Sequence, residues 1–173
     1  MKNTRPLTFR NSGSTKQLLS AAIIAALVQT TAFAAPPPND NLANAIVIPS
    51  TLPATVNGNN VEATAEPGEP NHSDTEPDID AGRKSVWWQW TSPITGPVIL
   101  TTEGSGSQDP ANPESTDPRV DTQVGVYTGD TIGTLTLIAK KEDSDGRFAY
   151  GWTYMTFNAV QGTTYKIAVD GWR

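Results

Sequence analysis

The segment Ser85–Thr91 (SVWWQWT) most constrains what this chain can fold into. Aromatic and β-branched residues dominate it and Pro93 ends it, which predicts an extended strand. Successive side chains of a strand point to opposite faces, so Trp88 and Trp90 share one face and Trp87 lies on the other. We therefore expect Trp88 and Trp90 to pack in a core.

Seven other segments have the apolar residues and bounding turn residues of short strands. They are Ala45–Ile48, Val61–Thr64, Val98–Thr102, Gln123–Thr128, Leu135–Ala139, Trp152–Ala159 and Thr164–Asp170. Residues 36–173 show no helical period over three turns. The chain is therefore predicted to be all-β, an antiparallel β-sandwich of about seven or eight strands. We expect Val98–Thr102 to form a hairpin with Ser85–Thr91, and a sandwich that ends after the last strand to expose an unpaired edge.

Residues 1–35 have the order of regions typical of a secretory signal peptide. Two Lys and two Arg are followed by the apolar run Leu18–Val28 and by the small residues around Ala34. The run is shorter than the roughly 20 residues needed to span a bilayer, so we expect cleavage and no membrane span afterwards. Residues 36–44 form a proline-rich lead-in and 45–173 the sandwich. The mature protein is expected to be secreted, periplasmic or at the cell surface.

Removal of the leader makes the chain strongly acidic. All 18 Asp and Glu but only eight of the 12 Lys and Arg lie after residue 35, which gives a net charge of −10. Such a charge repels nucleic acid and anionic lipid and favours divalent cations. The chain has no cysteine, so disulfides and a cysteine nucleophile are excluded.

Acidic residues near the expected strand ends are the candidate metal ligands. They are Asp121, Asp143, Asp145 and Asp170. The turn Glu142–Gly146 (EDSDG) groups oxygen ligands, which calcium prefers, but it lacks the spacing of an EF-hand. A solvated acidic turn is the alternative interpretation. Paired aspartates also leave open a small hydrolase.

The aromatic and histidine side chains give further candidates. Trp87 and Trp152 are candidate ligand-binding residues, because an exposed tryptophan can stack on a polysaccharide or pack on a partner protein. The single histidine, His72, lies in a polar loop beside Glu69. No sequence feature places it between a serine and a carboxylate, so we interpret it as a solvated or capping residue, not as a catalytic one.

Five segments, in this order, carry a resemblance to a known family. They are Pro38–Ala45 (PNDNLANA), Ala63–His72 (ATAEPGEPNH), Ser85–Thr91, Asp121–Gly129 (DTQVGVYTG) and Gly162–Gly171 (GTTYKIAVDG). Together they resemble the bacterial pre-peptidase C-terminal domain group, the jelly-roll-like accessory modules of exported proteases and cell-surface proteins. The resemblance implies a jelly-roll-like sandwich, in some members ion-stabilised. Members continue into a further strand, so it also implies that the domain here lacks its last strand.

The expected function is a non-catalytic accessory or binding module of an exported or cell-surface protein, with calcium as the candidate ion. A polysaccharide, a protein substrate or a cell-surface partner is the expected ligand class. Two alternatives stay open: a structural spacer or folding-aid domain of a larger surface protein, and a small hydrolase that uses paired aspartates.

Overall fold

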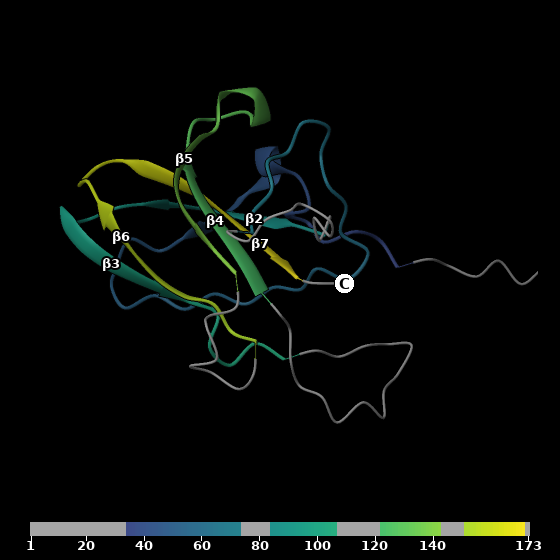
Figure 1. Ribbon diagram of the computed structural model, residues 1–173, viewed down its shortest axis with the longest axis horizontal. Coiled ribbons are helices and arrows are strands. Elements are labelled where there is room, and N and C mark those ends of the chain that lie inside the picture. Colours follow the sequence, from purple (N-terminus) through teal and green to yellow (C-terminus); the bar gives the residue numbers. More distant parts are fainter. Residues whose placement is uncertain (1–33, 74–83, 107–121, 143–150, 172–173) are drawn as a thin grey trace, which may run out of the picture. The chain divides into compact units, whose positions relative to one another are not determined.

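The computed structural model describes residues 34–73, 84–106, 122–142 and 151–171 (Figure 1). Within these ranges the chain forms seven strands and two short 3₁₀ helices. The strands are β1 (Ile46–Ile48), β2 (Val86–Thr91), β3 (Gly96–Thr101), β4 (Thr122–Thr128), β5 (Thr136–Lys141), β6 (Tyr154–Ala159) and β7 (Thr164–Gly171). The helices are η1 (Leu42–Asn44) and η2 (Ile132–Thr134). All but the last two residues of the expected leader lie outside the described ranges.

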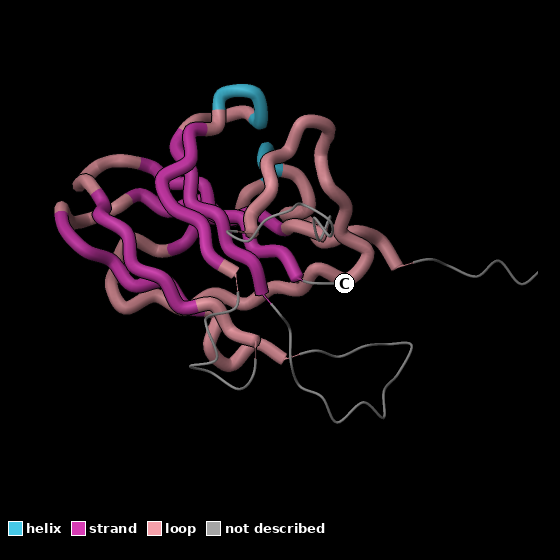
Figure 2. Tube along the Cα trace, viewed as in Figure 1, coloured by secondary structure: helices cyan, strands magenta, loops and turns pink. Residues whose placement is uncertain are grey.

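The strands form two sheets (Figure 2). Sheet A has five strands in the order β1-β2-β7-β4-β5, and sheet B has two, β3-β6. The pairs are antiparallel except β1–β2, which is parallel. The chain passes between the sheets after β2, β3, β5 and β6. The expected all-β sandwich is confirmed.

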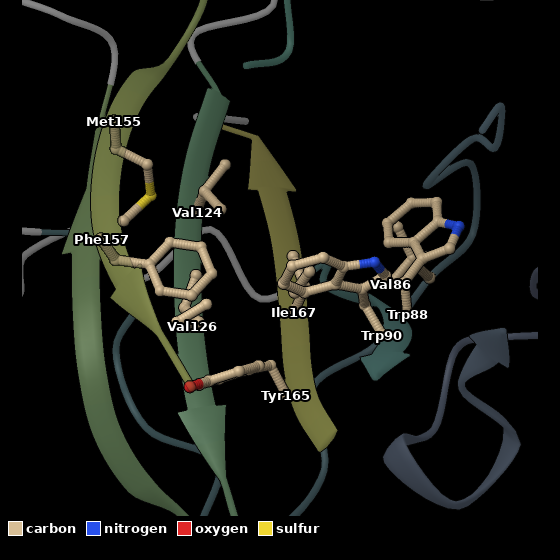
Figure 3. Close-up of a cluster of buried hydrophobic side chains, with 11 residues drawn as sticks. Val86, Trp88, Trp90, Val124, Val126, Met155, Phe157, Tyr165 and Ile167 are labelled. Carbon is tan, nitrogen blue, oxygen red and sulfur yellow. The ribbon is translucent and has the colours of Figure 1, made fainter. Parts of the chain in front are cut away.

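The core lies between the two sheets and is rich in aromatic rings (Figure 3). Trp90 and Tyr165 of sheet A lie with their ring centroids 6.5 and 5.2 Å from that of Phe157 in sheet B. Both pairs are edge-to-face, the geometry that aromatic quadrupoles favour. Trp88 is buried in the same cluster, so the predicted core face of the tryptophan-rich strand is confirmed.

The predicted hairpin between the tryptophan-rich strand and the next one was wrong. β2 pairs with β1 and β7, whereas β3 pairs with β6 in the other sheet. The cause lies at Ser92, whose N–H donates to the carbonyl of Thr163 and whose carbonyl accepts from the N–H of Gly162. Its hydroxyl also donates to the carbonyl of Ile94. These bonds tie the end of β2 to the start of β7, and the chain then crosses to sheet B.

The predicted strand at Val61–Thr64 does not form. The N–H of Val61 donates to the side chain of Asn59, and the N–H of Thr64 donates to Asp40 Oδ1 at 2.6 Å. Because side chains accept these backbone hydrogen bonds, the segment needs no neighbouring strand to satisfy them.

The last strand is paired on both sides and is not an edge of its sheet. β7 lies between β2 and β4, and the edges of sheet A are β1 and β5. In sheet B, Pro97 lies in β3, which pairs only with β6. A proline removes one backbone donor, so it fits a strand that has a single partner.

The outer face of sheet A, which points away from sheet B, is also covered. Leu42 of η1 packs there with Trp87, Tyr127 and Ala168 in a second apolar cluster. Ile132 of η2 packs against the same cluster. Sheet A is therefore largely covered on both faces, and its outer face buries polar residues such as Gln123, Lys166 and Asp170 beside this apolar cluster.

The two faces of sheet B give a direct test of the sandwich. Phe157 points into the core and Ile99, on the neighbouring strand, is 60 % exposed. Phe157→Ala should lower the free energy of unfolding by about 3–5 kcal/mol, because it removes a buried ring and leaves a cavity. Ile99→Ala should change it by less than about 0.5 kcal/mol. Urea unfolding followed by tryptophan fluorescence measures both. Equal losses would contradict this placement of β3 and β6.

Candidate functional site

The single histidine lies in a slot on the outer face of sheet A. His72 is 3 % exposed, so the interpretation of a solvated histidine was wrong. The slot exists because residue 125 is a glycine: a Cβ atom there would lie 2.5 Å from the ring and hydroxyl of Tyr127 and 2.8 Å from Nδ1 of His72. A glycine inside a strand is a sequence signal of close approach. The sequence does not indicate which side chain approaches.

Both ring nitrogens of His72 have partners. Nδ1 lies 2.8 Å from the hydroxyl of Tyr127, and Nε2 lies 2.9 Å from Oε1 of Glu69. A carboxylate only accepts hydrogen bonds, so Nε2 carries the proton on the Glu69 side. With that tautomer, Nδ1 accepts the hydrogen bond from the hydroxyl of Tyr127.

Glu69 is the centre of this cluster. Its Oε1 accepts from His72 and from the hydroxyl of Ser85, and its Oε2 accepts from the N–H of Glu66 at 2.7 Å. Burial by itself raises the pKa of Glu69, but the hydrogen bonds from His72, Ser85 and Glu66 outweigh it and hold the pKa below its ordinary value. Glu69 is therefore a buried carboxylate with three donors, an arrangement that favours the ionised form.

The neighbouring tyrosine stays protonated. Burial, and then the negative charge of Glu69, raise the pKa of Tyr127 above its ordinary value. Its hydroxyl therefore remains available as a donor to His72 at any pH at which proteins are ordinarily studied.

The arrangement does not match a serine nucleophile with its base. A catalytic serine donates to the histidine, which is held by a carboxylate on its far side. Here the hydroxyl of Ser85 donates to Glu69, and the histidine is bound on both sides. Ser85 is also fully buried. The cluster holds a loop on the sheet and does not align a hydroxyl for attack.

Two more acidic residues join the start of η1 and the residue range before it to the loop that contains His72. Asp40 accepts from the N–H and the hydroxyl of Thr64, and Glu66 accepts from the N–H of Leu42 at 2.6 Å. Asn39 exchanges two hydrogen bonds with the backbone of Trp87. Residues 39–42 and 64–72 are thereby fastened to each other and to β2.

Of the four predicted metal ligands, only Asp170 lies in the described residues; Asp121, Asp143 and Asp145 lie outside them. Asp170 is 4 % exposed at the end of β7, and its Oδ1 accepts from the N–H groups of Lys84 and Gly171. Burial raises the pKa of Asp170, although these bonds oppose it. Within the described ranges, no three His, Asp or Glu side chains converge as a metal-binding group.

The two predicted ligand-binding tryptophans differ in exposure. Trp87 is fully buried, with its ring edge-on to His72 at a centroid distance of 5.5 Å, so it presents no surface to a ligand. The prediction of Trp87 as a ligand-binding residue was therefore wrong, because a loop of this chain covers its face of the sheet. Trp152 is half-buried, and its indole N–H donates to the carbonyl of Ser105 at 2.7 Å.

Comparisons of the chain with models of protein families, with curated proteins and with solved structures give no match. Five segments that are far apart in the sequence nevertheless meet in space. Each contributes at least one side chain to the covered outer face of sheet A. These are Asp40 and Leu42, Glu66 and His72, Ser85 and Trp87, Gly125 and Tyr127, and Ala168 and Asp170.

The slot above Gly125 predicts a large effect from one methyl group. Gly125→Ala should lower the free energy of unfolding by about 1–3 kcal/mol, because two buried rings must move. Gly133→Ala is the matched control, since a Cβ there meets no atom within 4 Å; it should change the value by less than about 0.5 kcal/mol. Urea unfolding measures both. If the two variants unfold at the same midpoint, His72 does not occupy this slot.

Glu69 predicts a pH-dependent loss of stability. Its folded-state pKa is below the unfolded value near 4.5, so its contribution is complete above that pH and is lost as the pH falls through the folded-state pKa. Glu69→Gln should therefore cost about 1–3 kcal/mol at neutral pH, and the difference from the natural chain should shrink below pH 4.5.

The exposed Glu103, two residues after the end of β3, offers the control for this measurement. Glu103→Gln should follow the natural chain in urea unfolding across the same pH series. A constant difference between Glu69→Gln and the natural chain from pH 7 to pH 3 would contradict the ionised, hydrogen-bonded state of Glu69.

Proposed function

We propose that this chain is a non-catalytic binding module of an exported protein, and that it binds a neutral polysaccharide on the outer face of sheet B. The observation that carries the proposal is an uncharged, exposed sheet face beside two aromatic side chains, on a domain with a large negative charge.

The outward residues of sheet B are all exposed and none of them is charged. They are Pro97, Ile99 and Thr101 on β3, and Tyr154, Thr156 and Asn158 on β6. Hydroxyl, amide and apolar groups therefore share one surface. The segment 36–173 carries a net charge of −10, so a face without charge is a local exception. It favours a ligand that is itself uncharged and rich in hydroxyl groups.

Aromatic side chains lie at one end of this face. The β3–β6 pairing begins one residue before β6, since the N–H of Thr102 donates to the carbonyl of Thr153. Thr153 points inward and is fully buried, so Trp152 and Tyr154 lie on the outer side of an extended segment. Their positions are roughly 7 Å apart along the chain. Two rings at this spacing are suited to stack on neighbouring sugars.

The buried histidine and carboxyl groups of the described residues make hydrogen bonds within the fold. His72 and Glu69 are buried and hydrogen-bonded within the fold, and Asp170 is also buried. The Asp pairs of the hydrolase alternative involve residues outside the described ranges. A polysaccharide-binding face distinguishes the binding module from the spacer alternative.

Depletion from solution by insoluble polysaccharides tests the proposal. We expect the chain to bind cellulose or chitin, with little dependence on salt, and not to bind the acidic polymer alginate. Trp152→Ala and Tyr154→Ala should each weaken binding by about tenfold, the equivalent of roughly 1.4 kcal/mol of stacking.

Val47→Ala is the control for these variants, because Val47 is an exposed apolar residue on β1; it should bind as the natural chain does. Near-ultraviolet circular dichroism establishes that the variants are folded. Failure to bind any neutral polysaccharide, or full binding by folded Trp152→Ala and Tyr154→Ala, would refute this role and favour the spacer.

A further inference from the structure

A segment that lies outside the helices and strands covers part of the core. It spans residues 49–60, after β1, and its Val56 packs against the core cluster between the sheets. Gly58 lies against the ring of Trp88, where a Cβ atom on residue 58 would be 2.8 Å from Cζ2 and 3.3 Å from Cη2. Trp88 is 6 % exposed, and in Figure 3 its ring lies farther from Phe157 of sheet B than the ring of Trp90 does. The main chain at Gly58 therefore covers this ring.

Residue 58 has to be a glycine because of this contact. Its φ angle lies outside the left-handed region, so its main-chain conformation is open to other residues as well. A side chain would instead meet the carbons of the buried, rigid indole of Trp88, and overpacking of this kind destabilises a core. The fold thus requires glycine after Asn57, and Asn57-Gly58 is the only Asn-Gly pair in the sequence.

An Asn-Gly pair can react within its own main chain. The main-chain nitrogen of the glycine attacks the amide carbon Cγ of the asparagine, a new C–N bond closes a succinimide ring, and the side-chain nitrogen leaves as ammonia. Water then opens the ring at either carbonyl and gives aspartate or isoaspartate. Glycine promotes the attack because it has no Cβ atom beside the attacking nitrogen. Water is the only other reactant, so the reaction needs no oxidant and no enzyme.

Both reacting groups are accessible in this structure. Asn57 and Gly58 are exposed. Within the described residues, neither the side chain of Asn57 nor the main-chain N–H of Gly58 makes a hydrogen bond. The side chains of Asn39, Asn59 and Asn71, in contrast, are held by hydrogen bonds with the main chain. Asn57 therefore combines the reactive sequence with a local structure that leaves it free to react.

We propose that Asn57 is a site of spontaneous deamidation, and that its isoaspartyl product moves Gly58 off the ring of Trp88. In isoaspartate the main chain runs through the side-chain carbons, which lengthens it by one methylene group before Gly58. A contact that has no room for a Cβ atom does not absorb such a displacement. Aspartate keeps the ordinary main chain, so only the isoaspartyl product uncovers Trp88. This proposal does not depend on the polysaccharide-binding face.

Ageing of the full chain in warm, mildly alkaline buffer, followed by mass spectrometry of its peptides, tests the site. Asn57 should lose its amide at least about tenfold faster than Asn59 or Asn71, because the nitrogen that follows it belongs to an unhindered glycine. Asn57→Gln should abolish this conversion, since the longer side chain must close a larger ring. Asn59→Gln is the matched control from the same segment, and its Asn57 should convert as in the natural chain.

The release of Trp88 has separate readouts. The aged chain should contain a fraction whose Tm is lowered by about 2–4 °C, because part of the core has lost its cover. Its tryptophan fluorescence should shift to longer wavelength as water reaches the ring. Asn57→Asp, measured fresh, has the charge of the deamidated chain with an ordinary main chain. It should keep the Tm and the spectrum of the fresh natural chain.

Either of two results overturns the proposal. If Asn57 converts no faster than Asn59 and Asn71, the fold holds the Asn-Gly pair too rigidly to react. If a chain that has been converted to isoaspartate keeps the Tm and the fluorescence of the fresh chain, the longer main chain does not disturb Trp88.

Discussion

The outer face of sheet A depends on the contact between His72 and the bare backbone of Gly125. A β-sheet that buries only one face can leave its other face to solvent, without a loop to cover it. Here the second side carries Trp87 and Tyr127, which must also be covered. The covering loop contains a glutamate, and the loop packs closely because Glu69 receives three hydrogen bonds. Without the glycine, neither the imidazole nor the tyrosine hydroxyl has room.

Two buried carboxyl groups at this face have opposite protonation tendencies. The pKa of Glu69 is lowered because its hydrogen bonds outweigh burial. The pKa of Asp170 is raised because burial outweighs its two backbone donors. A carboxyl group with a lowered pKa stabilises the fold when it is ionised. A carboxyl group with a raised pKa destabilises the fold when it is ionised. The covering loop is thus held by a well-satisfied charge, beside a second carboxyl group that burial shifts toward its neutral form.

The sequence alone was sufficient for the class of fold and for most of the strands. Alternation of apolar residues and bounding turn residues are local signals, and they located β2, β4 and β7 within two residues at either end. The core role of Trp88 and Trp90 followed from the same alternation. The acidic charge and the lack of cysteine are likewise properties of composition. These features required no knowledge of which strands meet.

Only the tertiary structure decided which strands pair and which faces are covered. β3 has the same local pattern whether it pairs with β2 or with β6, and Ser92 selects the second by its bonds to the turn before β7. Trp87 points away from the core between the two sheets. It is nevertheless buried, because residues far away in the chain fold over it. The roles of His72 and Gly125 were hidden for the same reason. A hydrogen bond or a missing partner depends on the neighbours that a side chain meets in space, and local sequence does not encode them.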